Sequence, residues 1–134
     1  MVTKKLTGKV VLLVEDDYLV ADAMQAALEE EGMRVVGPYP SISSATRALD
    51  IEEHIDVALL DVHLNNERVF PLADRLIDEQ IPAVFVTGYE SETFPERFAN
   101  LPRLSKPVHY EALFACIAKL VSSNAKPKEE AEEE

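Results

Sequence analysis

The sequence predicts an α/β fold in which five parallel strands form a doubly wound sheet with helices on both faces. Short apolar runs rich in β-branched residues alternate along the chain with longer segments whose apolar residues recur at helical spacing. Strands joined by helical crossovers form parallel sheets covered on both faces, and these crossovers are right-handed. The 134 residues are enough for one such domain. We therefore expect the flavodoxin-like strand order 2-1-3-4-5.

The predicted strands are short and apolar. They are residues 9–14, 33–37, 56–60, 82–86 and 102–105, with the sequences KVVLLV, MRVVG, DVALL, PAVFV and PRLS. Apolar runs of this length, bounded by turn residues, are typical of strands buried on both faces of a sheet.

Helices are predicted between these strands. An apolar stripe from Leu19 to Leu28 marks the first, which ends at Gly32 because glycine is favoured just past a helix terminus. The second helix begins near Ser41 or Ser43, both of which are good N-cap residues.

The later helices differ in strength. The third is predicted from about residue 67 to 79, with Pro71 tolerated in its first turn. The connection over residues 89–101 contains Pro95 and few apolar residues, so we expect a short or frayed fourth helix there. The last helix begins after Pro107.

Composition excludes two classes of partner. The net charge of −12 argues against binding to nucleic-acid phosphates, which requires clustered Lys and Arg. The longest apolar run near the start, residues 10–14, is far too short to span a membrane, so we expect a cytoplasmic protein. The segment KPKEEAEEE at residues 126–134 is charged and lacks apolar periodicity, which is typical of a disordered tail. The predicted divisions are a lead-in over residues 1–8, one domain over residues 9–122 and an acidic tail over residues 123–134, with no output domain.

Acidic residues follow two of the predicted strands at the edge where parallel sheets carry their functional sites. Glu15 and Asp16 follow the first strand, and Asp61 follows the third. In the expected order these strands are neighbours, roughly 4.8 Å apart, so the three carboxylates share one pocket and need a compensating cation. An oxygen-rich pocket of this kind suits Mg²⁺, and Lys106 after the fifth strand would attract a phosphoryl group. A simpler interpretation, an acidic N-cap of the first helix, remains open for Asp17.

The ordered motifs VLLVEDD, ALLDVHL, VFVTG and SKP resemble the receiver domain of bacterial two-component response regulators over residues 9 to about 121. The resemblance implies a Mg²⁺ site. Asp16 and Asp61 would ligate the ion directly, Glu15 mostly through water, and His63 through its backbone carbonyl.

The resemblance also implies a phosphoacceptor in a phosphorelay, and not an enzyme with a separate substrate. Asp61 would take a phosphoryl group from a phosphohistidine of a sensor histidine kinase and form an aspartyl phosphate. Lys106 would contact a phosphoryl oxygen, and the Thr87 hydroxyl would bond the phosphate and couple it to loop movement. A downstream protein partner, of unknown identity, is implied as well.

The segment FVTGY at residues 85–89 is similar to the "FATGUY" subgroup of receivers, often stand-alone proteins that work with HWE or related sensor kinases. Two positions depart from the receiver pattern. Asn65 stands where most receivers have Pro, although Asn tolerates the left-handed backbone of a tight loop. Arg103 stands where many have a switching Tyr or Phe, so signalling is predicted to run through Tyr89 and the weak fourth helix instead.

Two other functions would share a strand-end Asp or the same fold. A phosphatase of the haloacid dehalogenase type needs an acid/base Asp two residues after the nucleophile, where this chain has His63. A pseudo-receiver, which keeps the fold but binds partners without phosphorylation, stays open as an alternative. The residues do not separate a messenger from a phosphate sink that drains a kinase.

Overall fold

The computed structural model describes residues 4–52, 54–88 and 93–133, and these form a five-stranded parallel sheet with the order β2-β1-β3-β6-β7. The sheet strands are β1 (Val10–Val14), β2 (Arg34–Tyr39), β3 (Val57–Asp61), β6 (Ala83–Thr87) and β7 (Arg103–Ser105). The helices are α1 (Tyr18–Glu30), α2 (Ile42–Ile51), α3 (Phe70–Asp78) and α4 (Tyr110–Glu133), with short 3₁₀ turns η1 (Lys4–Leu6) and η2 (Glu96–Phe98). Because β6 and β7 are the fourth and fifth strands of this sheet, the predicted order 2-1-3-4-5 is confirmed.

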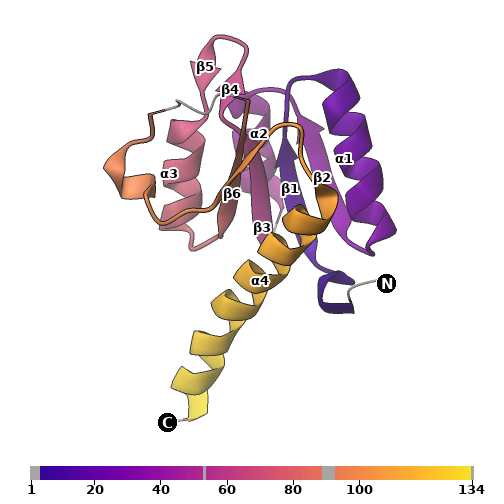
Figure 1. Ribbon diagram of the computed structural model, residues 1–134. Coiled ribbons are helices and arrows are strands. Elements are labelled where there is room, and N and C mark those ends of the chain that lie inside the picture. The colour runs from indigo at the N-terminus through magenta and orange to yellow at the C-terminus, as the bar shows by residue number, and fades with distance from the viewer. Residues whose placement is uncertain (1–3, 53, 89–92, 134) are drawn as a thin grey trace.

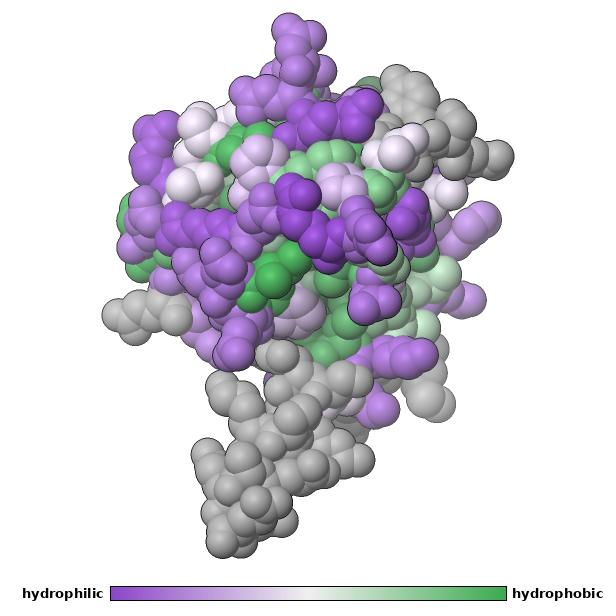
Figure 2. Space-filling model, turned by 90° about the vertical axis from the view of Figure 1, so that its left-hand side faces the viewer, coloured by the Kyte–Doolittle hydropathy of each residue, from purple (hydrophilic) through white to green (hydrophobic). Residues whose placement is uncertain are grey.

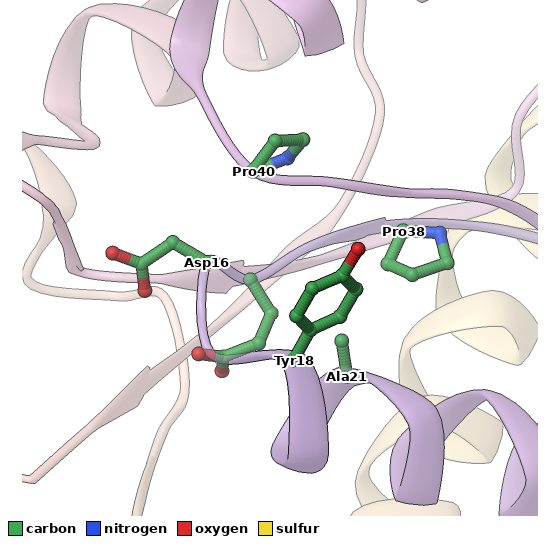
Figure 3. A pocket seen from close by; sticks show the side chains of 6 residues that line it. Asp16, Tyr18, Ala21, Pro38 and Pro40 are labelled. Carbon is green, nitrogen blue, oxygen red and sulfur yellow. The ribbon is translucent and has the colours of Figure 1, made fainter.

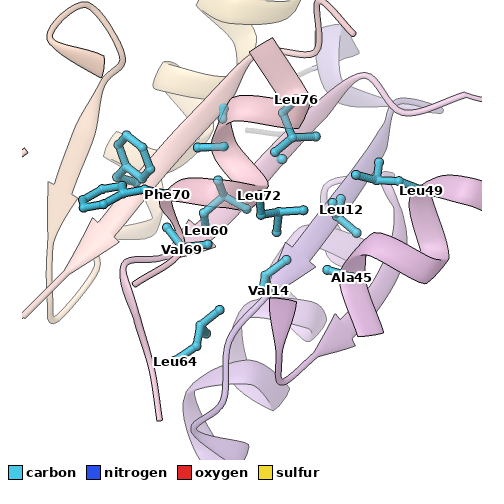
Figure 4. Close-up of a cluster of buried hydrophobic side chains, with 14 of the residues drawn as sticks. Leu12, Val14, Ala45, Leu49, Leu60, Leu64, Val69, Phe70, Leu72 and Leu76 are labelled. Carbon is cyan, nitrogen blue, oxygen red and sulfur yellow. The ribbon is translucent and has the colours of Figure 1, made fainter. Parts of the chain in front are cut away.

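Helices cover both faces of the sheet, as Figure 1 shows. Alternate residues of each central strand point to opposite faces. Leu12, Leu60 and Phe85 belong to a core beneath α2 and α3, which Figure 4 shows from close by. Leu13 and Leu59 belong to a second core beneath α1 and α4. The central strands are therefore buried on both sides, which is why they read as continuous apolar runs.

Side-chain caps fix where the first two helices begin. The Asp17 carboxylate accepts hydrogen bonds from the backbone N–H groups of Leu19 and Val20, and Ser41 Oγ accepts one from Ser44. The N-cap interpretation of Asp17 is therefore confirmed, and Ser41 is the N-cap of α2.

A hairpin that the sequence did not predict follows β3. Strands β4 (His63–Leu64) and β5 (Glu67–Arg68) pair antiparallel across a two-residue loop that begins with Asn65. The prediction that the third helix starts near residue 67 is consequently wrong, because those residues pair with β4 and α3 begins at Phe70. The left-handed conformation expected for Asn65 is confirmed by its φ of 57°.

The connection after β6 contains little helix, as predicted. Of residues 93–101, only η2 forms a helical turn, while residues 89–92 lie outside the described part of the chain. Helix α4 continues to Glu133, over the residues where the sequence predicts an acidic tail. The division of the chain at residue 122 stays a prediction.

A bulge in β2 places the backbone of the functional edge. Gly37 has φ +109°, and the pairing of β1 with β2 shifts between Leu12 and Val14. After the shift, the Tyr39 carbonyl accepts a hydrogen bond of 2.9 Å from the backbone N–H of Glu15. The bulge thus fixes the backbone position of Glu15, the residue that follows β1.

The surface is mainly hydrophilic on the side where α3 and η2 lie, as Figure 2 shows. The exposed large apolar side chains among the described residues are Tyr18, Leu19, Ile51 and Ile77. No helix in the described ranges has the length and apolarity that crossing a bilayer requires.

Substitution of Gly37 should destabilise the protein more than substitution of Gly8. Both have positive φ, but a Cβ on Gly37 would lie 2.7 Å from the Leu13 carbonyl oxygen, whereas one on Gly8 would meet nothing within 4 Å. We expect the free energy of unfolding of Gly37→Ala, measured by urea denaturation, to be about 1–3 kcal/mol lower than that of Gly8→Ala, because only Gly37→Ala adds overpacking to backbone strain. Equal losses would show that β2 can shift away from β1 at no cost.

Candidate functional site

Three carboxylates meet at the carboxyl ends of the two central strands. Val14 pairs with Leu60 in the register of β1 and β3, so Glu15 and Asp16 follow β1 beside Asp61 at the end of β3. Glu15, Asp16 and Asp61 each offer a carboxylate oxygen, and these oxygens lie within 4.8 Å of one another. The cluster predicted from the sequence is therefore present.

Lys106 supplies positive charge to this cluster. Its Nζ lies 3.2 Å from Asp61 Oδ2 and 3.2 Å from Glu15 Oε1. The Lys106 backbone N–H also donates to the Thr87 carbonyl at 2.9 Å, so the segment after β7 is bound to the end of β6. Thr87 is buried and pairs with Ser105 in the register of β6 and β7. The structure thus brings all the predicted phosphoryl-contacting residues to the same edge of the sheet.

The shared burial of these charges changes their proton affinities. Burial, followed by a hydrogen bond with Asp61, raises the pKa of Glu15 from an ordinary 4.5 to about 7. The Asp17 N–H and the Lys106 charge act in the opposite direction and offset only part of this increase. Burial lowers the pKa of Lys106, but the charges of Asp61 and Glu15 outweigh it, so this pKa lies above its ordinary value.

Backbone N–H groups hold the carboxylates as well. The Asp17 N–H donates to Glu15 Oε2 at 3.0 Å, and the His63 N–H donates to Asp61 Oδ1 at 3.3 Å. The Asn65 N–H donates to Asp16 Oδ2 at 2.7 Å. Sequence reasoning did not find the contact of Asn65, because the two residues are 49 positions apart and the donor is a backbone group.

A cavity of about 350 Å³ adjoins the acidic cluster. Its lining residues are Glu15, Asp16, Tyr18, Ala21, Pro38 and Pro40. Figure 3 shows the Tyr18 ring beside Ala21 and Pro38, with the Asp16 carboxylate on the other side. The site is thus reachable from solvent next to the first turn of α1.

An aromatic cluster lies on the strand that ends in Thr87. The Phe85 ring of β6 has its centroid 5.0 Å from that of Phe94, which is itself 5.6 Å from Phe70 of α3. The guanidinium carbon of Arg103 lies 3.7 Å from the Phe94 ring centroid, a cation–π contact. Arg103 therefore packs on the segment that follows Thr87.

The chain is similar to known receiver proteins over most of its length. Residues 11–118 match the family described as the response regulator receiver domain. The solution structure of SdrG from Sphingomonas melonis Fr1 is 32% identical, covers 89% of this chain and 99% of that one, and has a TM-score of 0.74. The chain therefore belongs to the response regulator receiver family.

Two further proteins show how far the similarity extends. A crystal structure of a CheY-like receiver domain protein from Methanospirillum hungatei JF-1 is 22% identical, covers 90% of this chain and 99% of that one, and has a TM-score of 0.77, which shows the fold. A protein of Bacillus subtilis (strain 168), named uncharacterized transcriptional regulatory protein YbdJ, is 26% identical over 85 residues. This match covers 62% of the present chain and 36% of that relative.

The donor set fits the divalent ion that the family implies. Hard carboxylate oxygens from two strand ends face one another, and Lys106 balances only part of their charge. Mg²⁺ prefers oxygen ligands and is held by few carboxylates, so the residues present suit it.

The Glu15 carboxyl should make the free energy of unfolding decrease as the pH rises. The folded state holds the Glu15 proton with a pKa of about 7 against an ordinary 4.5, so the carboxyl favours folding at low pH. This contribution is lost as the pH rises from 4.5 to 7. In metal-free urea denaturation, the free energy of unfolding of Glu15→Gln should therefore increase relative to the wild type across this range. A constant difference across the range would contradict the raised pKa.

Proposed function

We propose that this chain accepts a phosphoryl group on Asp61 from a phosphohistidine of a sensor histidine kinase, in a Mg²⁺-dependent reaction. The observation that carries the proposal is the buried Asp61 carboxylate with Lys106 Nζ at 3.2 Å, beside two further carboxylates, in a member of the receiver family. A donor of this kind would be a cytoplasmic partner.

In this reaction an Asp61 carboxylate oxygen attacks the phosphorus atom of the donor. The new O–P bond forms as the P–N bond of the phosphohistidine breaks, and the electron pair of that bond stays on the imidazole nitrogen. The position of Asp61 at the end of a rigid buried strand fixes the direction of attack. The product is an aspartyl phosphate, which a water molecule can later hydrolyse.

The surrounding residues would stabilise the charge of the transferring group. Lys106 can move its hydrogen bond from Asp61 Oδ2 to a phosphoryl oxygen while keeping its contact with Glu15. The Thr87 hydroxyl, on the neighbouring strand, would donate to another phosphoryl oxygen. Glu15, Asp16, Asp61 and the His63 carbonyl would hold Mg²⁺, which neutralises negative charge on the phosphoryl group.

The segment FVTGY at residues 85–89 supports membership of the FATGUY subgroup and a partner kinase of the HWE class. Tyr89 itself lies outside the described residues. We propose that the signal passes from Thr87 along this segment, and that Arg103 takes part through its contact with Phe94. A protein that works as a messenger would then present a changed surface after β6 to its partner.

Incubation with a small-molecule phosphodonor and Mg²⁺ should add one phosphoryl group to the protein, detected by intact-protein mass. The same treatment of Asp61→Asn should add none, because the amide is not a nucleophile. Chelation of Mg²⁺ should also abolish the modification, because the carboxylates then repel the donor. Full modification of Asp61→Asn would show that another residue is the phosphoacceptor. A wild type that stays unmodified even with candidate kinases would favour the pseudo-receiver.

A phosphate mimic should change amide hydrogen exchange and chemical shifts in residues 88–101. The expected reason is that a bond to Thr87 displaces β6, whose Phe85 ring packs against Phe94. Substitution of Arg103→Gln should enlarge the change, since it removes the cation–π contact that holds Phe94. If the exchange rates and chemical shifts of residues 88–101 stay unchanged in both proteins, this route is contradicted. Such a result would favour a phosphate sink.

A further inference from the structure

The hairpin after the nucleophile reaches back to the end of β1. Figure 1 shows β4 and β5 at the edge where the sheet strands end. Asn65 begins the hairpin loop and has φ 57°, a left-handed backbone conformation that Asn accepts more readily than most residues. The backbone N–H of this loop residue points to the Asp16 carboxylate and donates to it.

The resulting bond is short and charge-assisted. Asn65 N donates to Asp16 Oδ2 at 2.7 Å. It connects a carboxylate of the cluster after β1 to the loop that follows Asp61. A proline at position 65, the residue that the receiver pattern favours there, has no N–H and has φ fixed near −65°, so it could not make this bond.

We propose that Asn65 is a positioning residue for the metal site. Its backbone N–H fixes the orientation of the Asp16 carboxylate, and binding of the metal at Asp16 in turn stabilises the β4–β5 hairpin. The inference rests on the proposed function, because it assumes that Asp16 ligates Mg²⁺.

Two physical arguments support the role. Groups that orient a metal-ligating side chain typically change metal affinity by about 10–100-fold when they are removed. The Asp16–Asn65 bond is exposed to solvent, so we expect the lower end of that range. Coupling between the metal and the hairpin must also be reciprocal: if the bond favours metal binding, the metal favours the bond by the same factor.

Variants at position 65 test the first half of the proposal. Asn65→Pro removes the N–H, whereas the matched control Asn65→Gly keeps both the N–H and access to positive φ. The Mg²⁺ dissociation constant is measured by titrating the amide shifts of residues 13–17, and metal-free melting temperatures report on folding. We expect about 10-fold weaker binding for Asn65→Pro and wild-type binding for Asn65→Gly. Wild-type affinity in a folded Asn65→Pro variant would overturn the proposal.

Amide exchange in proteins with Asn65 intact tests the second half, and decides the matter if Asn65→Pro does not fold. Saturating Mg²⁺ should slow exchange of the Asn65 amide in the wild type. In Asp16→Ala, which lacks the acceptor carboxylate, the Asn65 amide should exchange faster than in the wild type. Mg²⁺ should not change its exchange rate in this variant. An Asn65 amide that exchanges at the same rate in all these conditions would overturn the proposal.

The controls separate this inference from the proposed function. A wild type that binds no Mg²⁺ would refute the metal site and the role of Asn65 together. A wild type that binds Mg²⁺ and is phosphorylated, with Asn65→Pro behaving identically, would refute the role of Asn65 alone.

Discussion

The Lys106 ammonium group lies between two buried carboxylates, and the functional edge of the sheet depends on this contact. Glu15 and Asp61 are both removed from solvent, which is costly for ionised groups unless charge is supplied. Burial and the neighbouring Asp61 carboxyl raise the pKa of Glu15, and the charge of Lys106 offsets only part of this increase. Under the proposed function, a metal ion bound at this site would release the proton that Glu15 holds near neutral pH.

The main parts of this site could be predicted because parallel strands end at one edge. Once the apolar runs are recognised as strands, the residues that follow them must gather, whatever the intervening helices do. Glu15, Asp61 and Lys106 were found in this way, from local pattern and strand order alone. The fold was predictable for a related reason, since central strands buried on both faces leave a continuous apolar run in the sequence.

The features that were not predicted depend on contacts that leave no recognisable pattern in the sequence. Strands β4 and β5 have two residues each, too few to show an alternating pattern, and Glu67 and Arg68 are equally suited to a helix start. The bulge at Gly37 depends on the close approach of the Leu13 carbonyl, which no local pattern reveals. The Asp16–Asn65 bond uses a backbone donor that every residue except proline possesses, so residue type alone gives no signal.

The interaction free energies at Thr87 and at Phe94 are similar in size. This similarity matters for how a receiver could switch when Arg103 replaces the usual aromatic residue. Thr87 and Phe85 are two residues apart on β6 and therefore point to the same face of the sheet. A hydrogen bond from Thr87 to a charged phosphoryl group would contribute about 1.5–3 kcal/mol. The exposed cation–π contact of Arg103 with Phe94 contributes about 0.5–1 kcal/mol, and each aromatic pair around Phe85 about 0.5–1.5 kcal/mol. One new bond at Thr87 is thus enough to offset the Arg103 contact and one ring contact, but not the whole cluster. In the proposed switch, such a balance would let residues 93–101 shift while the core beneath α3 stays packed.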